Sequence, residues 1–396
     1  MSQPEIPGLL YGEAENDLRQ TVRAFFTERL RPADALARTE SDEPYDLGLW
    51  HALAADLGCA GLLVPESAGG AGASYREAAV VAEETGRSVA PVPYLGSAVV
   101  ATTALIAAVG PEPAADPDRK LLGSLADGTV TAALAVPFES APDSELPRSV
   151  RVTGPAPDGL AEDGPAAASA RMTGTAARLA DALPADVLLV PADGVPYGLY
   201  AVDAHASGVT RSPMISLDST RQLCDLTLDA VPARRIATGD SAAAAVRAAL
   251  SAGAAVLAAE QLGLAERCLE TTVGYAKERR QFARPIGSFQ AIKHRLADLY
   301  VLVAQARAVA RYAAACLADR SADAPVAVAM AKAYCGEAAV KAAEECVQLH
   351  GGIGFTWEHP AHLYLKRAKS GSIAFGTPDR HRAALAGLVN LPGIPA

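Results

Sequence analysis

Three long stretches in the second half of the chain constrain its fold most. Residues 241–277, 288–319 and 324–349 are rich in alanine, and their apolar residues recur at intervals of three and four. That spacing is typical of helices that bury one face, and alanine is the strongest helix former. Because short breaks with glycine or proline separate the stretches, successive helices must fold back on one another. We therefore expect an antiparallel helical bundle in this part of the chain.

A glycine-rich break follows the third stretch. Gly351, Gly352 and Gly354 interrupt the helical pattern. A second break, Phe-Gly-Thr-Pro at 375–378, precedes a last short helix, because proline favours the first helical turn. Backbone N–H groups at helix starts bind phosphates well. Residues 348–382 are therefore either a binding region for the phosphates of a cofactor or coenzyme A ester, or an ordinary pair of helix connections.

The earlier part of the chain changes its pattern near residue 129. Amphipathic helices are expected over residues 13–38 and 45–57. Between 129 and 228, short β-type runs alternate with turn residues and no long helix separates them, which favours antiparallel strands over βαβ units. Residues 155–170 are low in complexity and are expected to form a loop. The predicted fold is α+β with three domains: an N-terminal helical domain (1–125), a middle antiparallel β-domain (126–235) and a C-terminal four-helix bundle (236–396).

Composition argues against several kinds of partner. The net charge is −10, only 5% of residues are aromatic, and no block of five basic residues occurs, which disfavours nucleic acid and anionic membranes. The six cysteines are scattered without a C-x-x-C pair, so we predict buried thiols in a reducing compartment and no metal site. The N-terminus lacks a basic, apolar leader, and no run of 18 uninterrupted apolar residues is present. These features predict a soluble cytoplasmic protein.

Four linear motifs resemble those of the acyl-CoA dehydrogenases, in the same order as in that family. They are GLLVPESAGGAGAS (61–74), GTAARLADALPADVLLV (174–190), RRQFARPIGSFQAIKHRLADLY (279–300) and QLHGGIGFTWEHPAHLYLKRAK (348–369). The resemblance extends over nearly the whole chain and is weakest between residues 138 and 172. It implies FAD held between subunits, an acyl-CoA or carrier-bound acyl substrate, an electron-transfer partner, and a homo- or hetero-oligomer that is a dimer or tetramer.

The resemblance also implies which residues contact FAD. These are Arg279, Phe282, Gln290, Gln348, Gly351, Gly352 and Thr377. Arg279 is expected to reach the FAD diphosphate from a neighbouring subunit, where a guanidinium can fork onto phosphate oxygens. Its alternative role is that of a solvated arginine at a helix end. For Thr377, the alternative to a nucleotide contact is a helix N-cap.

The chain departs from the family where a catalytic base is needed to remove the α-proton of the acyl thioester. The usual glutamate precedes the late Gly-Thr, and here Phe375 stands in its place. Alignment on the first bundle helix puts Gly253 at the second position used for the base. Glu260 lies close to two turns beyond Gly253 and points roughly the same way, and a carboxylate in apolar surroundings suits general-base work. We therefore predict Glu260 as the base, with a buried hydrogen-bond partner between helices or an FAD-adjacent group as the alternative.

The middle domain departs as well. Ala-Val-Pro-Phe-Glu-Ser, residues 135–140, replaces the family loop that faces flavin and thioester, and only Ser140 there offers a hydroxyl. Some relatives with a GGIGFTWEH-type segment are heteromers in which one chain supplies the base. Three hypotheses follow: a dehydrogenase that uses Glu260 or a partner's base, a non-catalytic subunit of a heteromer, or a different flavin reaction such as oxygenation or reduction on the same scaffold.

Overall fold

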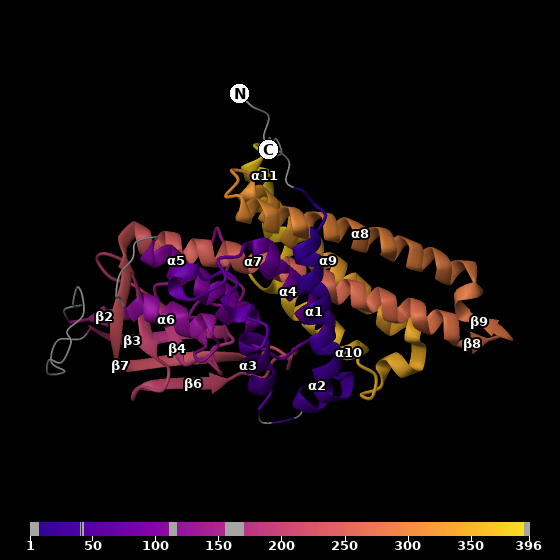
Figure 1. Ribbon diagram of the computed structural model, residues 1–396, viewed down its shortest axis with the longest axis horizontal. Helices are drawn as coiled ribbons and strands as arrows, with labels where there is room; N and C mark the ends of the chain where they lie inside the picture. Colours follow the sequence, from indigo (N-terminus) through magenta and orange to yellow (C-terminus); the bar gives the residue numbers. More distant parts are fainter. Residues whose placement is uncertain (1–7, 40, 42, 111–116, 155–169, 392–396) are drawn as a thin grey trace, which may run out of the picture. The chain divides into compact units, whose positions relative to one another are not determined.

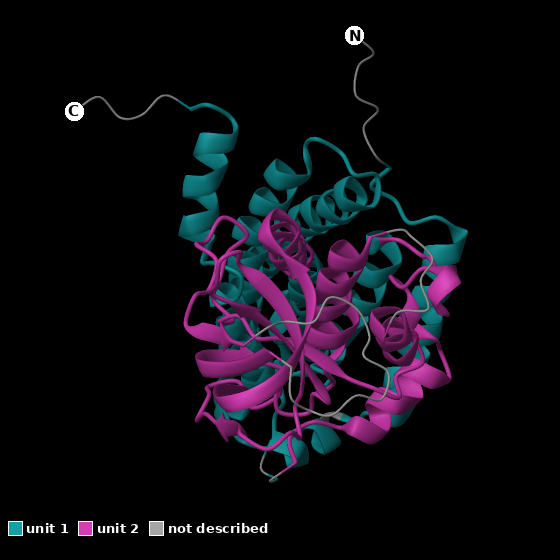
Figure 2. Cartoon of the chain, turned by 90° about the vertical axis from the view of Figure 1, so that its left-hand side faces the viewer, with its two compact units in different colours: residues 1–42, 75–91, 254–396 teal, residues 43–74, 92–253 magenta. Residues whose placement is uncertain are grey.

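The computed structural model of the protein describes residues 8–39, 41, 43–110, 117–154 and 170–391. The chain forms two compact units, each assembled from separate segments (Figure 2). Unit 1 comprises residues 1–42, 75–91 and 254–396, and unit 2 comprises residues 43–74 and 92–253. The units follow packing and not sequence order, so the three domain boundaries expected from the sequence stay a prediction. The predicted loop at 155–170 lies almost wholly outside the described residues.

Unit 2 contains a seven-stranded sheet, whose strand order is β1-β4-β5-β7-β3-β2 with β6 paired to β7 (Figure 1). The strands are β1 (Ala132–Leu134), β2 (Val150–Thr153), β3 (Ala170–Ala180), β4 (Val187–Ala192), β5 (Gly198–Asp203), β6 (Val209–Pro213) and β7 (Leu223–Thr238). Each pairing in this path is antiparallel except that of β1 with β4, which is parallel. The predicted antiparallel β-domain is therefore present, with one parallel pair at its edge.

Strand β6 and the full length of β3 are not predicted by the sequence pattern. On β3 the buried positions include Ala170, Met172, Ala176 and Leu179, with exposed or half-buried residues between them. Alanine is depleted in strands in general. The strand forms because its two neighbours, β2 and β7, pair with its backbone on both edges.

Helices of unit 2 precede the sheet in the chain. They are α3 (Leu47–Ala55), η1 (Cys59–Gly61), η2 (Glu66–Ala68), η3 (Tyr94–Ala101), α5 (Thr102–Val109) and α6 (Pro117–Ala126). Helix α3 starts after Asp46, whose side chain accepts a hydrogen bond of 2.9 Å from the backbone N–H of Leu49. Such a cap satisfies one of the first N–H groups of a helix, and it fixes the start of the helix predicted over 45–57.

Unit 1 is helical. Its elements are α1 (Glu13–Arg29), α2 (Pro32–Thr39), α4 (Tyr75–Ser88), most of α7 (Gly239–Glu278), the hairpin β8 (Arg280–Gln281) and β9 (Arg284–Pro285), η4 (Ile286–Ser288), α8 (Gln290–Ala318), α9 (Ala324–His350), η5 (Gly351–Phe355), α10 (Ala361–Ile373) and α11 (Pro378–Leu388). The three long predicted helices are confirmed. The single helix predicted over 13–38 is wrong, because Pro32 cannot continue α1 and instead opens α2.

Helix α9 lies at the centre of the bundle and packs against α8, α10 and α11. Helices α4 and α7 cross so closely that glycine is required on both. A Cβ on Gly86 would overlap the carbonyl of Glu260, and one on Gly263 would overlap the carbonyl of Glu83. By length and composition α7 and α8 could cross a membrane, yet the most apolar stretch of α7 is 72% buried inside the protein and that of α8 is 44% buried. Both serve the bundle.

Candidate active site

The hairpin β8–β9 joins the end of α7 to the start of α8 (Figure 1). Of the residues implied to contact FAD, Phe282 lies in the hairpin, Arg279 directly precedes it and Gln290 follows it. Gln281 pairs with Arg284, and the N–H of Ile286 donates to the carbonyl of Arg279 at 2.8 Å. Phe282 and Ala283 form the turn with φ of 51° and 64°, a region that side chains enter rarely. The turn leaves Phe282 87% exposed. A large apolar ring is therefore held outward at the tip.

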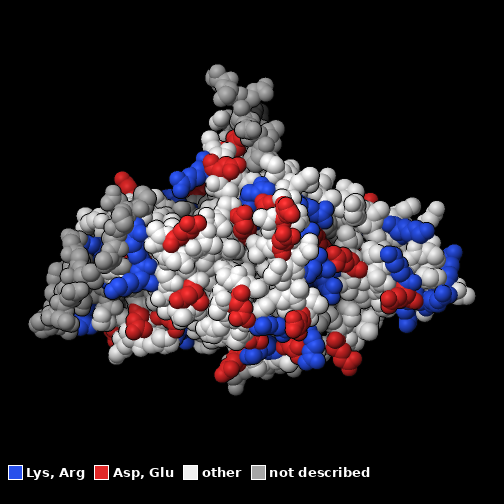
Figure 3. Space-filling view, in the orientation of Figure 1, with Lys and Arg blue, Asp and Glu red and all other residues white. Residues whose placement is uncertain are grey.

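Cationic side chains surround this tip. Arg279, Arg280 and Arg284 are all exposed. Figure 3 shows Lys and Arg gathered at the right-hand end of the view, where Figure 1 places the hairpin. Within the described residues the guanidinium of Arg279 makes no ion pair or hydrogen bond to the protein, whereas that of Arg284 lies over the Phe289 ring, 3.9 Å from its centroid. Arg279 is thus available to an external anion.

A second group of implied residues lies where α9 ends. Gly351 has φ of 63° and ψ of −138°, a conformation that favours glycine. A Cβ on Gly351 or Gly352 would meet no atom within 4 Å, so open space lies above both. Gln348 is exposed one turn earlier on α9. The break predicted from the glycines is therefore an accessible backbone surface.

Stacked rings bring the two groups to the same end of unit 1. The ring of Tyr275 on α7 stacks on that of His350 on α9, with centroids 4.4 Å apart, and His350 lies equally close to His359. Tyr275 is one helical turn before Arg279, and His350 directly precedes Gly351. The end of α7 and the end of α9 are therefore neighbours, as a shared binding surface requires.

Gln290 and Thr377 stand at helix starts. Gln290 is the exposed first residue of α8. Thr377 is the N-cap of α11, and its hydroxyl oxygen accepts a hydrogen bond of 3.3 Å from the N–H of Arg380. The alternative role of Thr377 as a helix cap is thus observed. Its contact with a nucleotide stays a prediction, as do the FAD contacts of the other implied residues.

The residues present fit a dinucleotide. The exposed guanidinium of Arg279, which has no partner among the residues that the structure describes, suits a diphosphate. The amides of Gln290 and Gln348 offer both donors and acceptors. The exposed ring of Phe282 offers an apolar face, and the open space above Gly351 and Gly352 admits a ligand to the backbone.

Glu260 is enclosed within unit 1. Its side chain is only 4% exposed, and its Oε1 lies 2.8 Å from Nε of Arg367, which is 3% exposed. The pair joins α7 to α10. A buried guanidinium needs an anionic partner because an uncompensated charge away from water is very unfavourable. Glu260 therefore has the role named as its alternative, a buried partner between helices, and its role as a base stays a prediction.

Neither of the two positions that the resemblance implies for the base carries a side chain that accepts a proton. Phe375 is buried and has φ of 52°. Gly253 is a buried residue of α7. In the loop at 135–140, the Glu139 carboxylate is engaged by Arg178, whose Nε donates to it at 2.8 Å. No replacement base is evident at these three places.

Sequence reasoning missed Lys332, the buried lysine of α9. Its Nζ donates to the carbonyl oxygens of Gly371 at 3.0 Å, Ser372 at 3.3 Å and Gly376 at 3.2 Å. Burial lowers the pKa of Lys332 to about 7. The sequence held one signal: Val328 and Gly336, one turn before and after Lys332, are apolar, which places the lysine on the inward face of the helix.

Comparison with known proteins gives matches along most of the chain. The acyl-CoA dehydrogenase N-terminal domain matches residues 12–128, and the acyl-CoA dehydrogenase C-terminal domain matches residues 243–388. Acyl-CoA dehydrogenase IpdE2 of Mycobacterium tuberculosis is 37% identical over 366 residues, which are 92% of this chain and 94% of that protein.

Two solved structures share both fold and sequence with the chain. A variant of the Tcur3481–Tcur3483 steroid ACAD is 33% identical with a TM-score of 0.80, covering 97% of this chain and 99% of that one. The ChsE4–ChsE5 complex from Mycobacterium tuberculosis is 28% identical with a TM-score of 0.82, covering 98% of this chain and 100% of that one.

These matches confirm the predicted fold class, with helical, β and helical parts in order. They also confirm the predicted class of enzyme, a flavin oxidoreductase whose cofactor is FAD. The matches leave open whether this chain is active alone. The chain belongs to the acyl-CoA dehydrogenase family.

Proposed function

We propose that this chain is a flavin-holding subunit of a hetero-oligomeric acyl-CoA dehydrogenase, in which a partner chain supplies the catalytic base. The proposal is supported by the residues found at the positions where the resemblance implies a base. Phe375 and Gly253 occupy the two family positions, and the carboxylate of Glu260 already neutralises Arg367. A subunit without a base can still contribute binding surface to the reaction.

The reaction sets what this chain must and need not provide. Desaturation of an acyl thioester requires removal of an α-proton and departure of a hydride from the β-carbon; FAD, when bound, accepts that hydride. The Arg279 guanidinium would hold the diphosphate, and the backbone at Gly351 and Gly352 would approach the cofactor closely. The buried Phe375 side chain can exclude water but accepts no proton.

The comparisons support a two-chain assembly. The names Tcur3481–Tcur3483 and ChsE4–ChsE5 each describe a pair of chains, and the former is called a steroid ACAD. By analogy we propose a bulky acyl thioester as substrate, carried on coenzyme A or a carrier protein. An electron-transfer partner and a cytoplasmic location remain predictions.

A second candidate keeps the base within this chain. Glu260 lies on α7 close to two turns beyond Gly253, on the same side of the helix. For Glu260 to act, its carboxylate would have to leave Arg367 during the reaction. The ion pair therefore favours the partner-supplied base.

Flavin content tests the proposal. The chain would be purified alone and after co-expression with a dehydrogenase-like chain encoded by a neighbouring gene. Flavin absorbance per chain would be compared between the two preparations. We expect sub-stoichiometric flavin alone and a higher content in a mixed oligomer. A chain that carries one FAD by itself and is bleached by an acyl-CoA would refute the need for a partner.

A further inference from the structure

We propose that Lys332 is a positioning residue for the flavin site: its ammonium group fixes the backbone turn at residues 374–377 between α10 and α11. The inference rests on the proposed function only for the flavin, because Thr377 is the residue of this turn that is predicted to reach the nucleotide. The hold of Lys332 on the turn is a property of the chain itself.

Below about pH 7, where Lys332 carries its proton, its ammonium group is committed entirely to this connection. The side chain is fully buried, and its three donors have three acceptors: the carbonyls of Gly371 and Ser372 in the last turn of α10, and that of Gly376 beyond it. The final carbonyls of a helix lack partners within the helix, and a cation there also interacts favourably with the helix dipole. In the described part of the chain no carboxylate pairs with Lys332, so the backbone turn is its partner.

The turn needs such ties because its conformation is unfavourable. Phe375 has φ of 52° and Gly376 has φ of 100°. A residue other than glycine with positive φ persists only where its surroundings enforce it. A second tie comes from α11, where Nε2 of His381 donates to the carbonyl of Phe375 at 2.8 Å. Lys332 and His381 thus hold consecutive residues, and Thr377 follows at once as the cap of α11.

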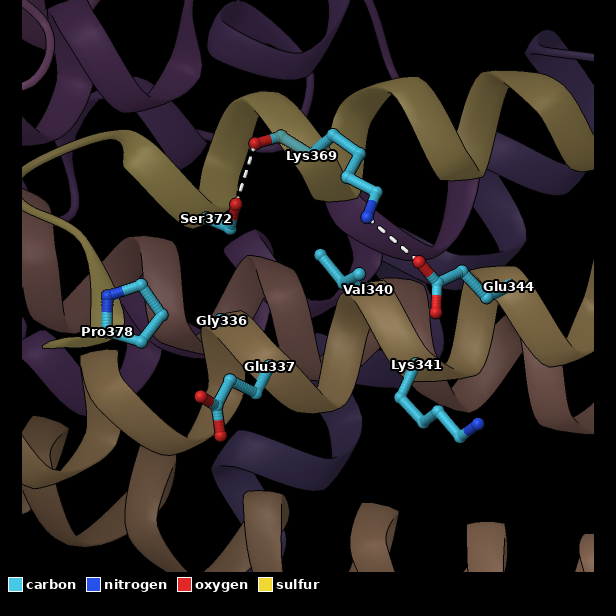
Figure 4. Close-up of a pocket in the computed structure, with 8 residues that line it drawn as sticks. All are labelled: Gly336, Glu337, Val340, Lys341, Glu344, Lys369, Ser372 and Pro378. Atoms are coloured by element: carbon cyan, nitrogen blue, oxygen red, sulfur yellow. Dashed lines mark hydrogen bonds and ion pairs between the residues drawn. The ribbon is translucent and has the colours of Figure 1, made fainter.

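The turn is enclosed by the bundle: Ala374, Phe375 and Gly376 are buried, and Thr377 is exposed. A groove of about 310 Å³ lies beside the two ends of the turn, with Ser372 before it, Pro378 after it and Gly336 of α9 in its lining (Figure 4). In Figure 4 the side chain of Lys369 on α10 points to Glu344 on α9, and the two pair at 2.8 Å. The backbone between these two ends is held by the hydrogen bonds that Lys332 makes to Gly376 and His381 makes to Phe375.

Two glycines, Gly336 and Gly371, allow close packing near Lys332. A Cβ on Gly336 would lie 3.3 Å from Cγ of Pro378 and 3.8 Å from Nζ of Lys332. A Cβ on Gly371 would lie 3.2 Å from Nε2 of Gln261 on α7. Gly336 therefore lets the start of α11 approach the middle of α9 beside Lys332, and Gly371 lets α10 approach Gln261 of α7.

The test substitutes Lys332→Met, which keeps the length of the side chain and removes its donors, and Lys332→Gln, which keeps N–H donors without charge. Lys341→Met is the matched control, because Lys341 is an exposed lysine of the same helix that pairs with Glu345 at 2.9 Å. Amide hydrogen exchange in the apoprotein measures how stably the turn is held in the absence of flavin. Titration of each apoprotein with FAD, followed by flavin fluorescence, measures FAD affinity. Far-UV circular dichroism checks that each variant is folded.

For Lys332→Met we expect amide hydrogen exchange in residues 374–381 to accelerate by about tenfold or more, while exchange in α7 and α8 stays unchanged. We expect FAD affinity to fall by about tenfold, the size of effect that loss of one hydrogen bond from a charged group produces. Lys332→Gln should be intermediate and Lys341→Met like wild type. Unchanged exchange in the turn, or equal acceleration throughout the bundle, would overturn the inference. If Lys332→Met fails to fold, Lys332→Gln decides by the same two readouts.

Failure of the proposed function would look different. Flavin bleaching independent of any partner would refute the partner-supplied base and leave the exchange result intact. If wild-type chain binds FAD only in the mixed oligomer, the titration uses that oligomer. Absence of FAD binding in both forms would overturn the flavin part of the inference, while exchange still decides whether Lys332 holds the turn.

Discussion

Replacing Glu260 by glutamine separates the two roles open to this residue. In the structure its carboxylate lies 2.8 Å from Nε of Arg367, and both side chains are almost wholly buried between α7 and α10. Glu260→Gln keeps the shape and removes the charge, so the guanidinium of Arg367 is left buried without compensation. Removing one partner of a buried pair costs about 3–5 kcal/mol. We therefore expect the free energy of unfolding to fall by that amount.

The magnitude is tested by a double-mutant cycle. The double variant Glu260→Gln/Arg367→Met removes both charges, and we expect it to regain most of the lost stability, because apolar replacement of a buried pair is often neutral or better. Glu344→Gln is the matched control. Its partner Lys369 lies at the same 2.8 Å but both side chains are nearly half exposed, so the loss should be at most about 1 kcal/mol.

The assay is denaturant unfolding followed by far-UV circular dichroism, with an unchanged denaturant dependence as the condition for comparing variants. The same variants, assembled with a base-bearing partner, would be mixed anaerobically with an acyl-CoA. If Glu260→Gln unfolded at the wild-type denaturant concentration yet lost flavin bleaching completely, Glu260 would be the base. The structural reading of the ion pair would then be wrong.

Three further predictions follow from other contacts. Burial lowers the pKa of Lys332 from 10.5 to about 7, so between these values the native state binds fewer protons than the unfolded state and stability rises with pH. From pH 7 to 8.5 the wild type should gain roughly 1.5 kcal/mol of unfolding free energy relative to Lys332→Met; equal pH slopes in denaturant unfolding would contradict this. Gly263→Ala should lower the free energy of unfolding by about 1–3 kcal/mol, because its Cβ would overlap the Glu83 carbonyl. Gly274→Ala in the same helix, where a Cβ meets open space, should raise it by about 0.5–1 kcal/mol. Similar thermal midpoints for the two variants would refute the close crossing of α4 and α7. Arg279→Gln should lower FAD affinity by about tenfold, the loss of one charged hydrogen bond, and flavin titration of Lys277→Gln should match wild type.

The bundle was predictable because its signals are local. Helices α7, α8 and α9 were predicted from alanine content and apolar spacing. The end of α9 was predicted from the glycine at position 351, which adopts a positive φ. Phe375 and Gly253 were also identified from the linear sequence by aligning the motifs, and the lack of a base at these two positions stays a prediction.

What escaped prediction depends on contacts distant in sequence. Glu260 and Arg367 are 107 residues apart, and the sequence around each residue does not indicate that the two form an ion pair. Lys332 resembles any helical lysine until its three acceptors, some 40 residues later, are in place. Strand β3 has an alanine-rich sequence that becomes a strand through its pairing with β2 and β7.

The central claim is that this chain contributes flavin-binding surface and no base. Its most direct test is single-turnover flavin bleaching in the mixed oligomer, with the partner's candidate base glutamate replaced by glutamine while this chain is left intact. The account predicts that flavin content is retained and bleaching is lost. Bleaching at the wild-type rate in that oligomer would place the base on this chain and contradict the account.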